Sequence, residues 1–256
     1  MVVTINIGNS HILFGIWQED CLLFRSTISS DLNRSTDEYA IQLHSILSLH
    51  QVSLLEISGG IISSVVPSLT GRIRSAIQQV CHTKFFTVGP GLKSGLSIRI
   101  DNPAQLGAEL VCAAVAALES FPPPLIVITM DTAISIMAIN ENQQLLGGSI
   151  FPGPILSFDA LIQKTAQLSQ VDLDSCPNSI IGTNTISSMQ SGFIWGTACM
   201  LDGMIAKFQQ ELNGNALVVC TGRIPGAVRS ACTTSMHYQQ NLILRGLLLI
   251  YRKNSR

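Results

Sequence analysis

The sequence predicts an α/β protein built from two related halves, and three observations lead to this prediction. A pattern of apolar strand, short polar turn and second apolar strand occurs twice, at residues 2–16 and again at 125–139. Apolar runs of strand length alternate with amphipathic stretches of helix length between the two copies. Phe121-Pro-Pro-Pro124 forms a stiff linker just before the second copy. The expected halves are therefore residues 1–120 and 121–256.

The turns of the two hairpins suggest a chemistry for this repeat. When the copies are aligned, Asn6 falls opposite Thr129, and the turns are Gly8-Asn9-Ser10 and Asp131-Thr132-Ala133. Backbone N–H groups and hydroxyls in such turns can bind an anion such as phosphate. Two turns that face a common cleft would hold a nucleoside triphosphate from both sides, as sugar kinases and actin do. Two ordinary antiparallel hairpins would give the same pattern, so this alternative stays open.

The first half shows strands and helices in alternation. Ser35-Thr-Asp-Glu38 forms a capping box ahead of a helix that runs to about His50. A buried strand follows at residues 59–66, and Pro67 is well placed to begin the next helix. A further strand at residues 84–88 completes an α/β pattern.

The helix predicted to begin at Asn102-Pro103 carries a candidate catalytic residue. Asn caps this helix, Pro stands in its first turn, and it is expected to run to about Glu119. Gly107 and Ala108 remove bulk near its start, and the carboxylate of Glu109 could face the space they leave. A solvent-facing Glu, favoured by the helix dipole, is the alternative.

The second half contains a long helix, predicted over residues 186–212. Its glycines at 192, 196 and 203 stand among large apolar side chains, and a glycine inside a helix is costly unless something approaches closely. A partner helix in a dimer is one explanation, and dense packing within the domain is the other. The strand at 216–222 ends in a turn suited to a nucleotide, and residues 242–251 predict a buried C-terminal helix.

Composition limits the classes of function. Hydrophobic residues make up 46% of the 256 residues and charged residues 12%, a balance that favours an oligomer interface. The net charge of −1 and the scattered basic residues argue against nucleic acid as a partner. No apolar run has membrane-spanning length, and the N-terminus begins at once with a strand, so we expect a cytoplasmic protein that does not bind membranes. The seven cysteines and five histidines are dispersed and indicate neither a disulfide framework nor a zinc site.

Several segments in conserved order and spacing resemble the type III pantothenate kinases, which begin coenzyme A synthesis. The resemblance extends over nearly the whole chain and implies the duplicated actin-like fold (ASKHA, ribonuclease H-like) with two facing halves. The matching segments are Ile7-Gly-Asn-Ser10, Ser63-Ser-Val-Val-Pro67, Gly91-Leu-Lys-Ser-Gly-Leu-Ser-Ile-Arg99, Asp101-Asn-Pro103, Gly107-Ala108, Gly147-Gly148, Pro152-Gly153, Leu156-Ser-Phe-Asp-Ala-Leu161, Lys164-Thr-Ala166, Gly182-Thr-Asn-Thr185, Met189-Gln-Ser-Gly192 and Gly246-Leu-Leu-Leu-Ile-Tyr251.

The resemblance also implies substrates, cofactors and partners. These are ATP and pantothenate, Mg²⁺, a monovalent cation (K⁺ or NH₄⁺), and a dimer with active sites near its interface. The catalytic base falls on Glu109, and Thr129 occupies the position of the monovalent-cation ligand. The implied ATP and phosphate contacts are Asn6, Gly8, Asn9, Ser10, Thr132 and Gly222. The implied substrate contacts are Ile100, Gly107, Ala108, Glu109, Leu110 and Thr185.

In the first half, this chain departs from the family pattern at positions of chemical importance. Asn6 stands where the family has an Asp, and Asn lacks the negative charge that helps to hold a hydrated Mg²⁺. The family's Gly-Ala-Asp-Arg reads Gly107-Ala-Glu-Leu110, which lengthens the base by one methylene and removes an arginine. Ile100 replaces the aromatic residue expected in the pantothenate pocket.

The second half departs from the pattern at its phosphate-binding turns. The family's Asp-x-Gly-Thr reads Thr129-Met-Asp131-Thr132, so a carboxylate is lost at Thr129 and a charge is gained at Asp131. Asp131 would repel phosphate, and the Gly pair after the late strand becomes Gly222-Arg223.

Two classes of function follow. In the first, the chain is an enzyme that phosphorylates pantothenate to 4′-phosphopantothenate with Glu109 as base, with weak or altered catalysis. In the second, it is a non-catalytic paralogue: the partner subunit of an active kinase, in a heterodimer rather than a homodimer, or a ligand-sensing regulator. An intact homologue in the same genome would favour the second class, and a genome without another pantothenate kinase would favour the first.

Overall fold

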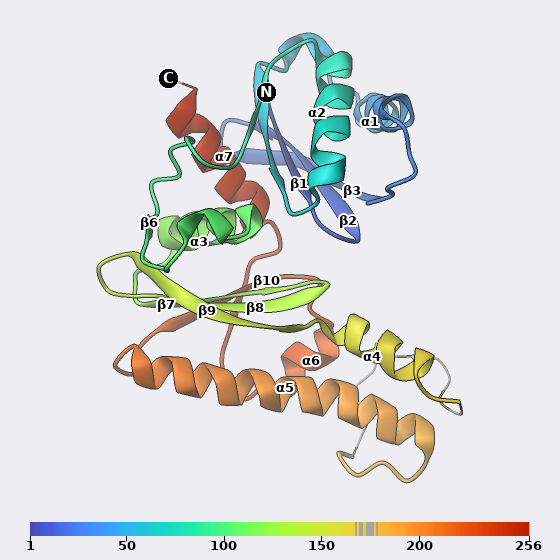
Figure 1. Ribbon diagram of the computed structural model, residues 1–256, viewed down its shortest axis with the longest axis vertical. Coiled ribbons are helices and arrows are strands. Elements are labelled where there is room, and N and C mark those ends of the chain that lie inside the picture. The colour runs from blue at the N-terminus through green and yellow to red at the C-terminus, as the bar shows by residue number, and fades with distance from the viewer. Residues whose placement is uncertain (167, 169–170, 173–176, 178, 256) are drawn as a thin grey trace. The chain divides into compact units, whose positions relative to one another are not determined.

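The computed structural model describes residues 1–166, 168, 171–172, 177 and 179–255, which form two compact units (Figure 1). The first unit comprises Met1–Leu96, Asp101–Ala116 and Asn241–Arg256, and the second comprises Ser97–Ile100 and Ala117–Gln240. The first unit therefore takes its last helix from the C-terminal end of the chain. The division into related halves at 1–120 and 121–256 stays a prediction.

The first unit is built on a five-stranded sheet with the order β3-β2-β1-β4-β5. Strand β1 is antiparallel to β2 and parallel to β4, which in turn is parallel to β5. The strands are β1 Val2–Ile7, β2 His11–Gln18, β3 Cys21–Ser29, β4 Gly59–Ser64 and β5 Phe85–Thr87.

The second unit repeats this topology. Its sheet has the order β11-β10-β7-β8-β9-β6, so strands β7–β11 follow the same path as β1–β5, with β6 added at the edge beside β9. The strands are β6 Ser97–Ile98, β7 Leu125–Met130, β8 Ala133–Ile139, β9 Gln144–Pro152, β10 Leu217–Gly222 and β11 His237–Tyr238.

The strand register confirms the predicted equivalence of Asn6 and Thr129. Asn6 on β1 pairs with Ser63 on β4, and Thr129 on β7 pairs with Thr221 on β10. Beyond the turn, the strand pairing of the two hairpins differs from the sequence alignment by one residue. Ile7 pairs with Ile12 in the first hairpin, whereas Met130 pairs with Ile134 in the second, so the second turn is one residue shorter.

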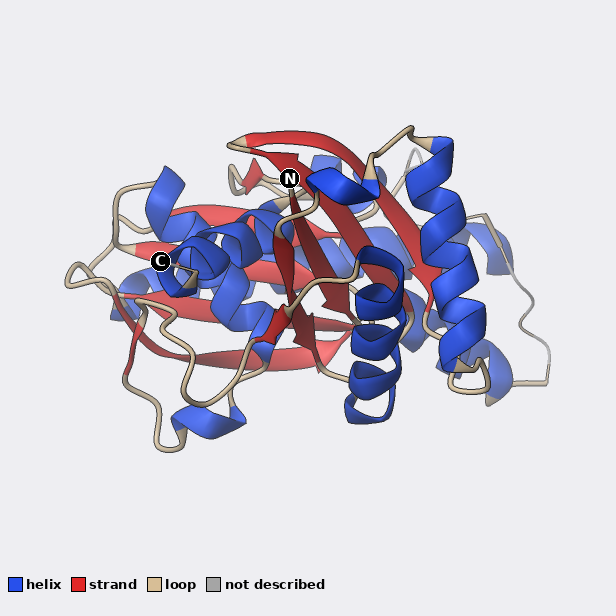
Figure 2. Ribbon diagram, turned by 90° about the horizontal axis from the view of Figure 1, so that it is seen from above, coloured by secondary structure: helices blue, strands red, loops and turns tan. Residues whose placement is uncertain are grey.

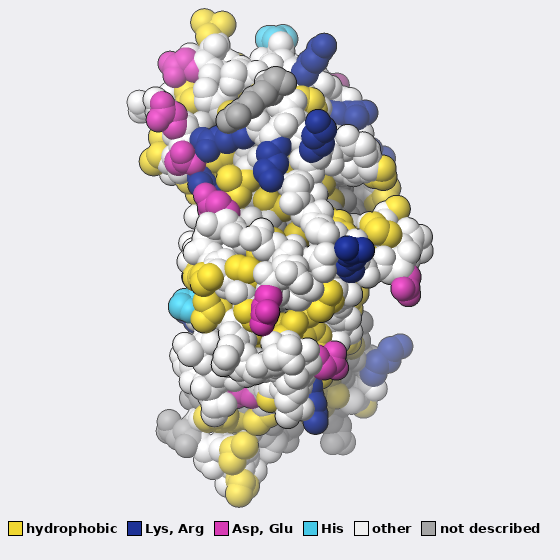
Figure 3. Space-filling view, turned by 90° about the vertical axis from the view of Figure 1, so that its left-hand side faces the viewer, with side chains coloured by type: hydrophobic (Ala, Val, Ile, Leu, Met, Phe, Trp, Pro, Cys, Tyr) yellow, Lys and Arg dark blue, Asp and Glu magenta, His cyan; other side chains and the backbone are white. Residues whose placement is uncertain are grey.

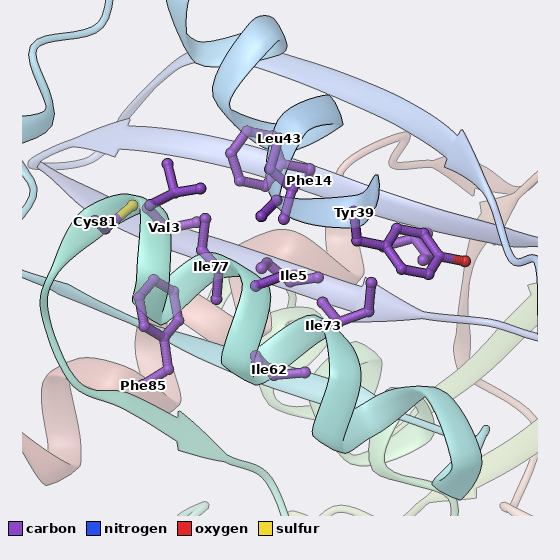
Figure 4. Close-up of a cluster of buried hydrophobic side chains, with 14 of the residues drawn as sticks. Val3, Ile5, Phe14, Tyr39, Leu43, Ile62, Ile73, Ile77, Cys81 and Phe85 are labelled. Carbon is purple, nitrogen blue, oxygen red and sulfur yellow. The ribbon is translucent and has the colours of Figure 1, made fainter. Parts of the chain in front are cut away.

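Helices α1 (Thr36–Leu49) and α2 (Pro67–Cys81) contact each other and cover one face of the first sheet (Figures 1 and 2). The predicted capping box is present, with Ser35 and Glu38 bonding reciprocally at the start of α1. The apolar sides of both helices meet alternate residues of β1, β2 and β4 (Figure 4). Since successive side chains of a strand point to opposite faces, burying Ile5 and Ile7 in this core turns Asn6 to the other face.

Helix α3 (Ala108–Ser120) corrects the prediction of a helix that begins at Asn102-Pro103. Asn102 does cap a helical turn, but that turn is only the 3₁₀ segment η2 (Pro103–Gln105). A new helix starts at Ala108, so Glu109 lies in the first turn of α3 rather than in the second turn of a longer helix.

Helix α7 (Leu242–Asn254) covers the opposite face of the first sheet, where it contacts β1, β2 and β4. Gly15 of β2 shows that α7 lies on this face. A methyl group added at Gly15 would lie 3.1 Å from both Leu244 of α7 and Thr4 of β1. The unit also contains the 3₁₀ segment η1 (Leu54–Glu56).

The second unit has its core between its sheet and helix α5 (Thr185–Glu211), with α4 (Pro154–Gln163) and α6 (Gly226–Ala231) beside it. Asn184 caps α5 through the backbone N–H of Ser187. Among the described residues, a methyl group added at Gly192, Gly196 or Gly203 would meet nothing within 4 Å. Dense packing against the part of the chain that the structure describes therefore does not account for these glycines.

Among the described residues, no helix is both long and apolar enough to cross a membrane. On the face shown in Figure 3, Lys and Arg side chains gather in the upper part of the view, with acidic side chains beside them. In the first unit, Asp20 accepts hydrogen bonds from Arg245 at 2.6 Å and from Arg252 at 2.8 Å.

Candidate active site

The first group of candidate side chains, which we name the amide cluster, consists of Asn6, Ser63, Glu109 and Cys112. Asn6 and Ser63 are side by side near the carboxyl ends of β1 and β4, and both are buried. Ser63 Oγ donates a 2.5 Å hydrogen bond to Asn6 Oδ1, and Asn6 Nδ2 donates a long one, 3.5 Å, to Glu109 Oε2. The Asn6 amide therefore connects a buried hydroxyl with the candidate base.

Glu109 reaches this position because α3 begins one residue before it. A carboxylate in the first turn of a helix is stabilised by the positive end of the helix dipole, and Glu109 is half-buried rather than fully exposed. A methyl group added at Gly107 would make only ordinary contacts, 3.7 Å to Leu110 and 3.8 Å to Val65. Space alone therefore does not require glycine at this position.

Cys112, the fourth residue of the amide cluster, lies about one helical turn after Glu109 on α3, and its thiol is fully buried. Its burial raises the pKa of the thiol, the nearby charge of Glu109 raises it further, and a hydrogen bond with Ser63 opposes both. The thiol stays protonated at neutral pH and has no character of a nucleophile.

The turn of the first hairpin is hydrogen-bonded to Ser30, the residue that follows β3. Ser30 donates its hydroxyl to Gly8 O at 2.6 Å and its backbone N–H to Ser10 O at 3.0 Å. Gly8 is buried, whereas Asn9 is exposed at the tip of the turn. The structure thus brings the predicted phosphate-binding residues Gly8, Asn9 and Ser10 into one held turn directly after Asn6.

Thr129, the predicted position of a cation ligand, lies in a row of three buried hydroxyls. Ser135 on β8 and Thr221 on β10 are its direct cross-strand neighbours, and all three residues are at least nine-tenths buried. These oxygens are neutral, so a monovalent cation would find no carboxylate here. Thr129 therefore lacks the carboxylate that the resemblance implies for a monovalent-cation ligand.

Asp131 and Arg223 form an ion pair at the second turn, and we name residues 130–133 with Gly222 and Arg223 the ion-paired turn. Asp131 follows β7, Arg223 follows β10, and Arg223 donates Nε to Asp131 Oδ1 at 2.8 Å and also contacts it through Nη2. Two charges that seemed independent in the sequence are therefore neutralised by each other.

Two glycines, Gly222 and Gly153, allow neighbouring backbone segments to pack closely against the residues of this turn. Gly222 has φ +100°, and a methyl group there would lie 2.1 Å from Met130 O. Gly153 approaches the turn from the start of α4, and its N–H donates to Thr132 O at 2.8 Å. A side chain at Gly222 would both strain the backbone and collide with β7.

The remaining predicted contacts, Ile100 and Thr185, belong to the second unit but lie at different places in it. Ile100 follows β6 and lies near Gly147 of β9. Thr185 is the first residue of α5 and lines a cavity of about 750 Å³ between α4, α5 and the β8–β9 hairpin. Apolar residues dominate this cavity, Phe158 and Phe193 among them.

The described residues contain no group of three or more His, Cys, Asp or Glu side chains that could hold a metal ion by themselves. This is compatible with Mg²⁺ bound through nucleotide phosphates and water, which needs only one or two protein carboxylates. Glu109 in the first unit and Asp131 in the second are each a carboxylate that could serve in this way.

Comparison with known proteins identifies the family. The profile described as type III pantothenate kinase matches residues 2–207. A type III pantothenate kinase from Geotalea daltonii is 36% identical over 254 residues, which is 99% of both chains. Another from Exiguobacterium sp. is 35% identical over 256 residues, the full length of both chains. The chain belongs to the type III pantothenate kinase family.

Solved structures related to the chain confirm the actin-like fold. The activator of the 2-hydroxyisocaproyl-CoA dehydratase from Clostridium difficile, with bound ADPNP, has a TM-score of 0.57 and 12% identity over 97% of this chain and 92% of its own. An inorganic polyphosphate/ATP-glucomannokinase from Arthrobacter sp. has a TM-score of 0.50 and 11% identity, covering 99% of both chains. At such low identities these structures bear on the fold alone.

The geometry shows that residues which depart from the expected family pattern contact one another in this member of the family. Asn6 contacts Glu109, and Asp131 contacts Arg223, so four of the changed positions form two touching pairs. Sequence reasoning treated each change as an isolated loss. For Asp131 and Arg223, the signal that could have joined them was their position directly after two apolar strands, 125–130 and 217–222.

Proposed function

We propose that this chain phosphorylates pantothenate with ATP, using Glu109 as the general base. The observation that supports this most directly is the carboxylate of Glu109, which the first turn of α3 and the Asn6 amide hold in place in a chain of this family. The full-length similarity to named type III pantothenate kinases supplies the substrate and the donor.

The reaction needs little covalent chemistry from the protein. The oxygen of a pantothenate hydroxyl attacks the γ-phosphorus of ATP, its proton passes to the Glu109 carboxylate, and ADP leaves. Each of the two turns, Gly8-Asn9-Ser10 in the first unit and the ion-paired turn in the second, offers hydrogen-bond donors that suit phosphate. Mg²⁺, when bound with the nucleotide, neutralises charge on the transferred phosphoryl group.

The direct test is an assay of ATP-dependent pantothenate phosphorylation by the purified chain, alone and mixed with an intact homologue. Turnover by the isolated chain supports the proposal. No turnover alone, but faster turnover by the homologue in the mixture, would contradict it and favour the non-catalytic partner.

The contact between Asn6 and Glu109 predicts the result of restoring the family residue at position 6. Asn6→Asp places a second carboxylate about 3.5 Å from Glu109, and two such close carboxylates raise the pKa of one of them. The base would hold its proton more tightly, so kcat should fall by at least about tenfold near neutral pH and recover as pH rises.

Shortening the base should relieve this conflict. The double variant Asn6→Asp/Glu109→Asp separates the two carboxylates by one methylene, and its kcat should exceed that of Asn6→Asp and lose the alkaline shift. If Asn6→Asp alone is as active as wild type with an unchanged pH profile, the contact has no role in catalysis.

We also propose that two copies of the chain associate through α4 and α5. The glycines of α5 are open, and the neighbouring surface exposes large apolar side chains. Among them are Ile155 and Leu156 of α4, each 47% exposed, and Ile186 of α5, 55% exposed. An apolar surface of this kind beside an apolar cavity is typical of a protein interface.

Light scattering should therefore give wild type twice the mass of one chain at micromolar concentration. Gly196→Glu introduces a charge into the proposed interface, its Cβ would meet no described atom within 4 Å, and the variant should give the monomer mass. Gly71→Glu is the matched control, because Gly71 in α2 is equally open. A monomeric wild type, or a dimer unaffected by Gly196→Glu, would contradict this interface.

A further inference from the structure

The ion pair between Asp131 and Arg223 joins the carboxyl ends of two neighbouring parallel strands. Met130 and Gly222, the last residues of β7 and β10, are directly paired, and Arg223 N donates to Met130 O at 2.7 Å. Ligands of open α/β sheets bind outside the carboxyl ends of the parallel strands. The ion pair therefore stands at an edge where a ligand is expected, rather than at an arbitrary part of the surface.

The backbone around this ion pair is tightly fixed, but the two side chains are accessible. Gly222 and Gly153 pack against the turn so closely that an added methyl group would lie 2.1 Å from a turn carbonyl in each case. The Arg223 and Asp131 side chains, by contrast, are 45% and 40% exposed. Ion pairs this exposed contribute little to stability, so a multivalent ion can separate the two side chains at small cost.

We propose that the magnesium complex of a nucleoside polyphosphate opens this ion pair, with Arg223 binding a phosphate and Asp131 turning to the hydrated Mg²⁺. This inference rests on the proposed function for its ligand. The guanidinium group matches phosphate oxygens with two parallel hydrogen bonds, and a phosphate carries more charge than the carboxylate it replaces. A carboxylate oxygen is in turn a ligand that Mg²⁺ or its water shell prefers.

The charges predict opposite effects for the two members of the pair. Arg223→Gln removes the phosphate ligand and leaves Asp131 as an uncompensated charge against the phosphates, so it should weaken binding with or without Mg²⁺. Asp131→Asn releases the guanidinium from its competing carboxylate and should strengthen binding of the metal-free nucleotide. With Mg²⁺ present, the same change removes a metal contact and should weaken binding.

Calorimetry with the β,γ-imido analogue of ATP tests this, in EDTA and then in excess Mg²⁺. Arg223→Gln should raise Kd by at least about tenfold in both conditions, the size of a lost charge-assisted contact. Asp131→Asn should lower Kd about threefold or more in EDTA and raise it in Mg²⁺. Circular dichroism of each variant confirms that the fold is retained.

The matched control is Arg252→Gln, which removes the same charge from another exposed Arg–Asp pair, in α7 of the first unit. Its Kd should stay within twofold of wild type. An Arg223→Gln variant that also stays within twofold overturns the proposal, and so does an Asp131→Asn effect of the same sign in both conditions.

Measuring both nucleotide affinity and pantothenate phosphorylation separates a failure of the ion-pair proposal from a failure of the proposed function. Wild type that phosphorylates pantothenate while Arg223→Gln keeps its nucleotide affinity would overturn only the role of the ion pair. Wild type that binds no nucleotide in either condition and shows no phosphorylation would overturn both.

Discussion

Glu109→Gln should reduce ATP-dependent phosphorylation of pantothenate by at least about a hundredfold, since general-base catalysis contributes roughly 10²–10⁴ to such a rate. Gln keeps the length and an oxygen that can accept the hydrogen bond from Asn6 Nδ2, so the amide cluster should keep its shape. The loss should therefore appear in kcat, with the affinity for pantothenate and the free energy of unfolding close to those of wild type.

The control for this variant lies on the same helix. Glu119→Gln makes the same chemical change near the C-terminal end of α3, at an exposed position whose carboxylate accepts a hydrogen bond from Ser120. It should leave kcat within twofold of wild type. A Glu109→Gln enzyme with normal kcat would show that another group takes the proton, and a variant that unfolds at ordinary temperature would show a structural role instead.

Gly246→Ala should lower the free energy of unfolding by about 2 kcal/mol or more. Gly246 lies in the buried part of α7, and an added methyl group would be 1.9 Å from the backbone carbonyl oxygen of Cys112 on α3. Because that atom belongs to a helix backbone and not to a flexible side chain, α7 or α3 must shift. This loss of stability is larger than the roughly 0.5–1 kcal/mol by which replacing Gly with Ala normally stabilises a helix interior.

Denaturant or thermal unfolding measures this difference, with a fall in Tm of roughly 4–8 °C expected for a chain of this size. Gly71→Ala is the matched control, because Gly71 lies in the interior of α2 with nothing within 4 Å of the added methyl group. It should be neutral or stabilising by up to about 1 kcal/mol. If both substitutions act alike, the close approach of α7 to α3 is not present in solution.

The sequence by itself determined most of the secondary structure and the duplication. Apolar strands separated by polar turns predicted β1 with β2 and β7 with β8, and the capping box predicted α1 from Ser35. These features depend on interactions between residues close in the chain, which a linear pattern records. The motif segments also identified the family, because their order and spacing match over nearly the whole chain.

Local signals misplaced the start of the helix that carries Glu109. Asn102 and Pro103 do begin a helical turn, but it ends after Gln105 and a new helix begins at Ala108. A cap and a proline indicate where a helix can start, whereas the packing of the finished fold decides how far it continues.

Only the tertiary structure decided how the unusual residues of the candidate site act on one another. Asn6 and Glu109 are 103 residues apart in the chain, and Asp131 and Arg223 are 92 apart. Strand pairing and the start of α3 bring each pair together, and no local pattern contains that information. The sequence therefore showed four separate changes of charge or length, while the fold shows two contacts: an amide that meets the base, and an arginine that neutralises a carboxylate.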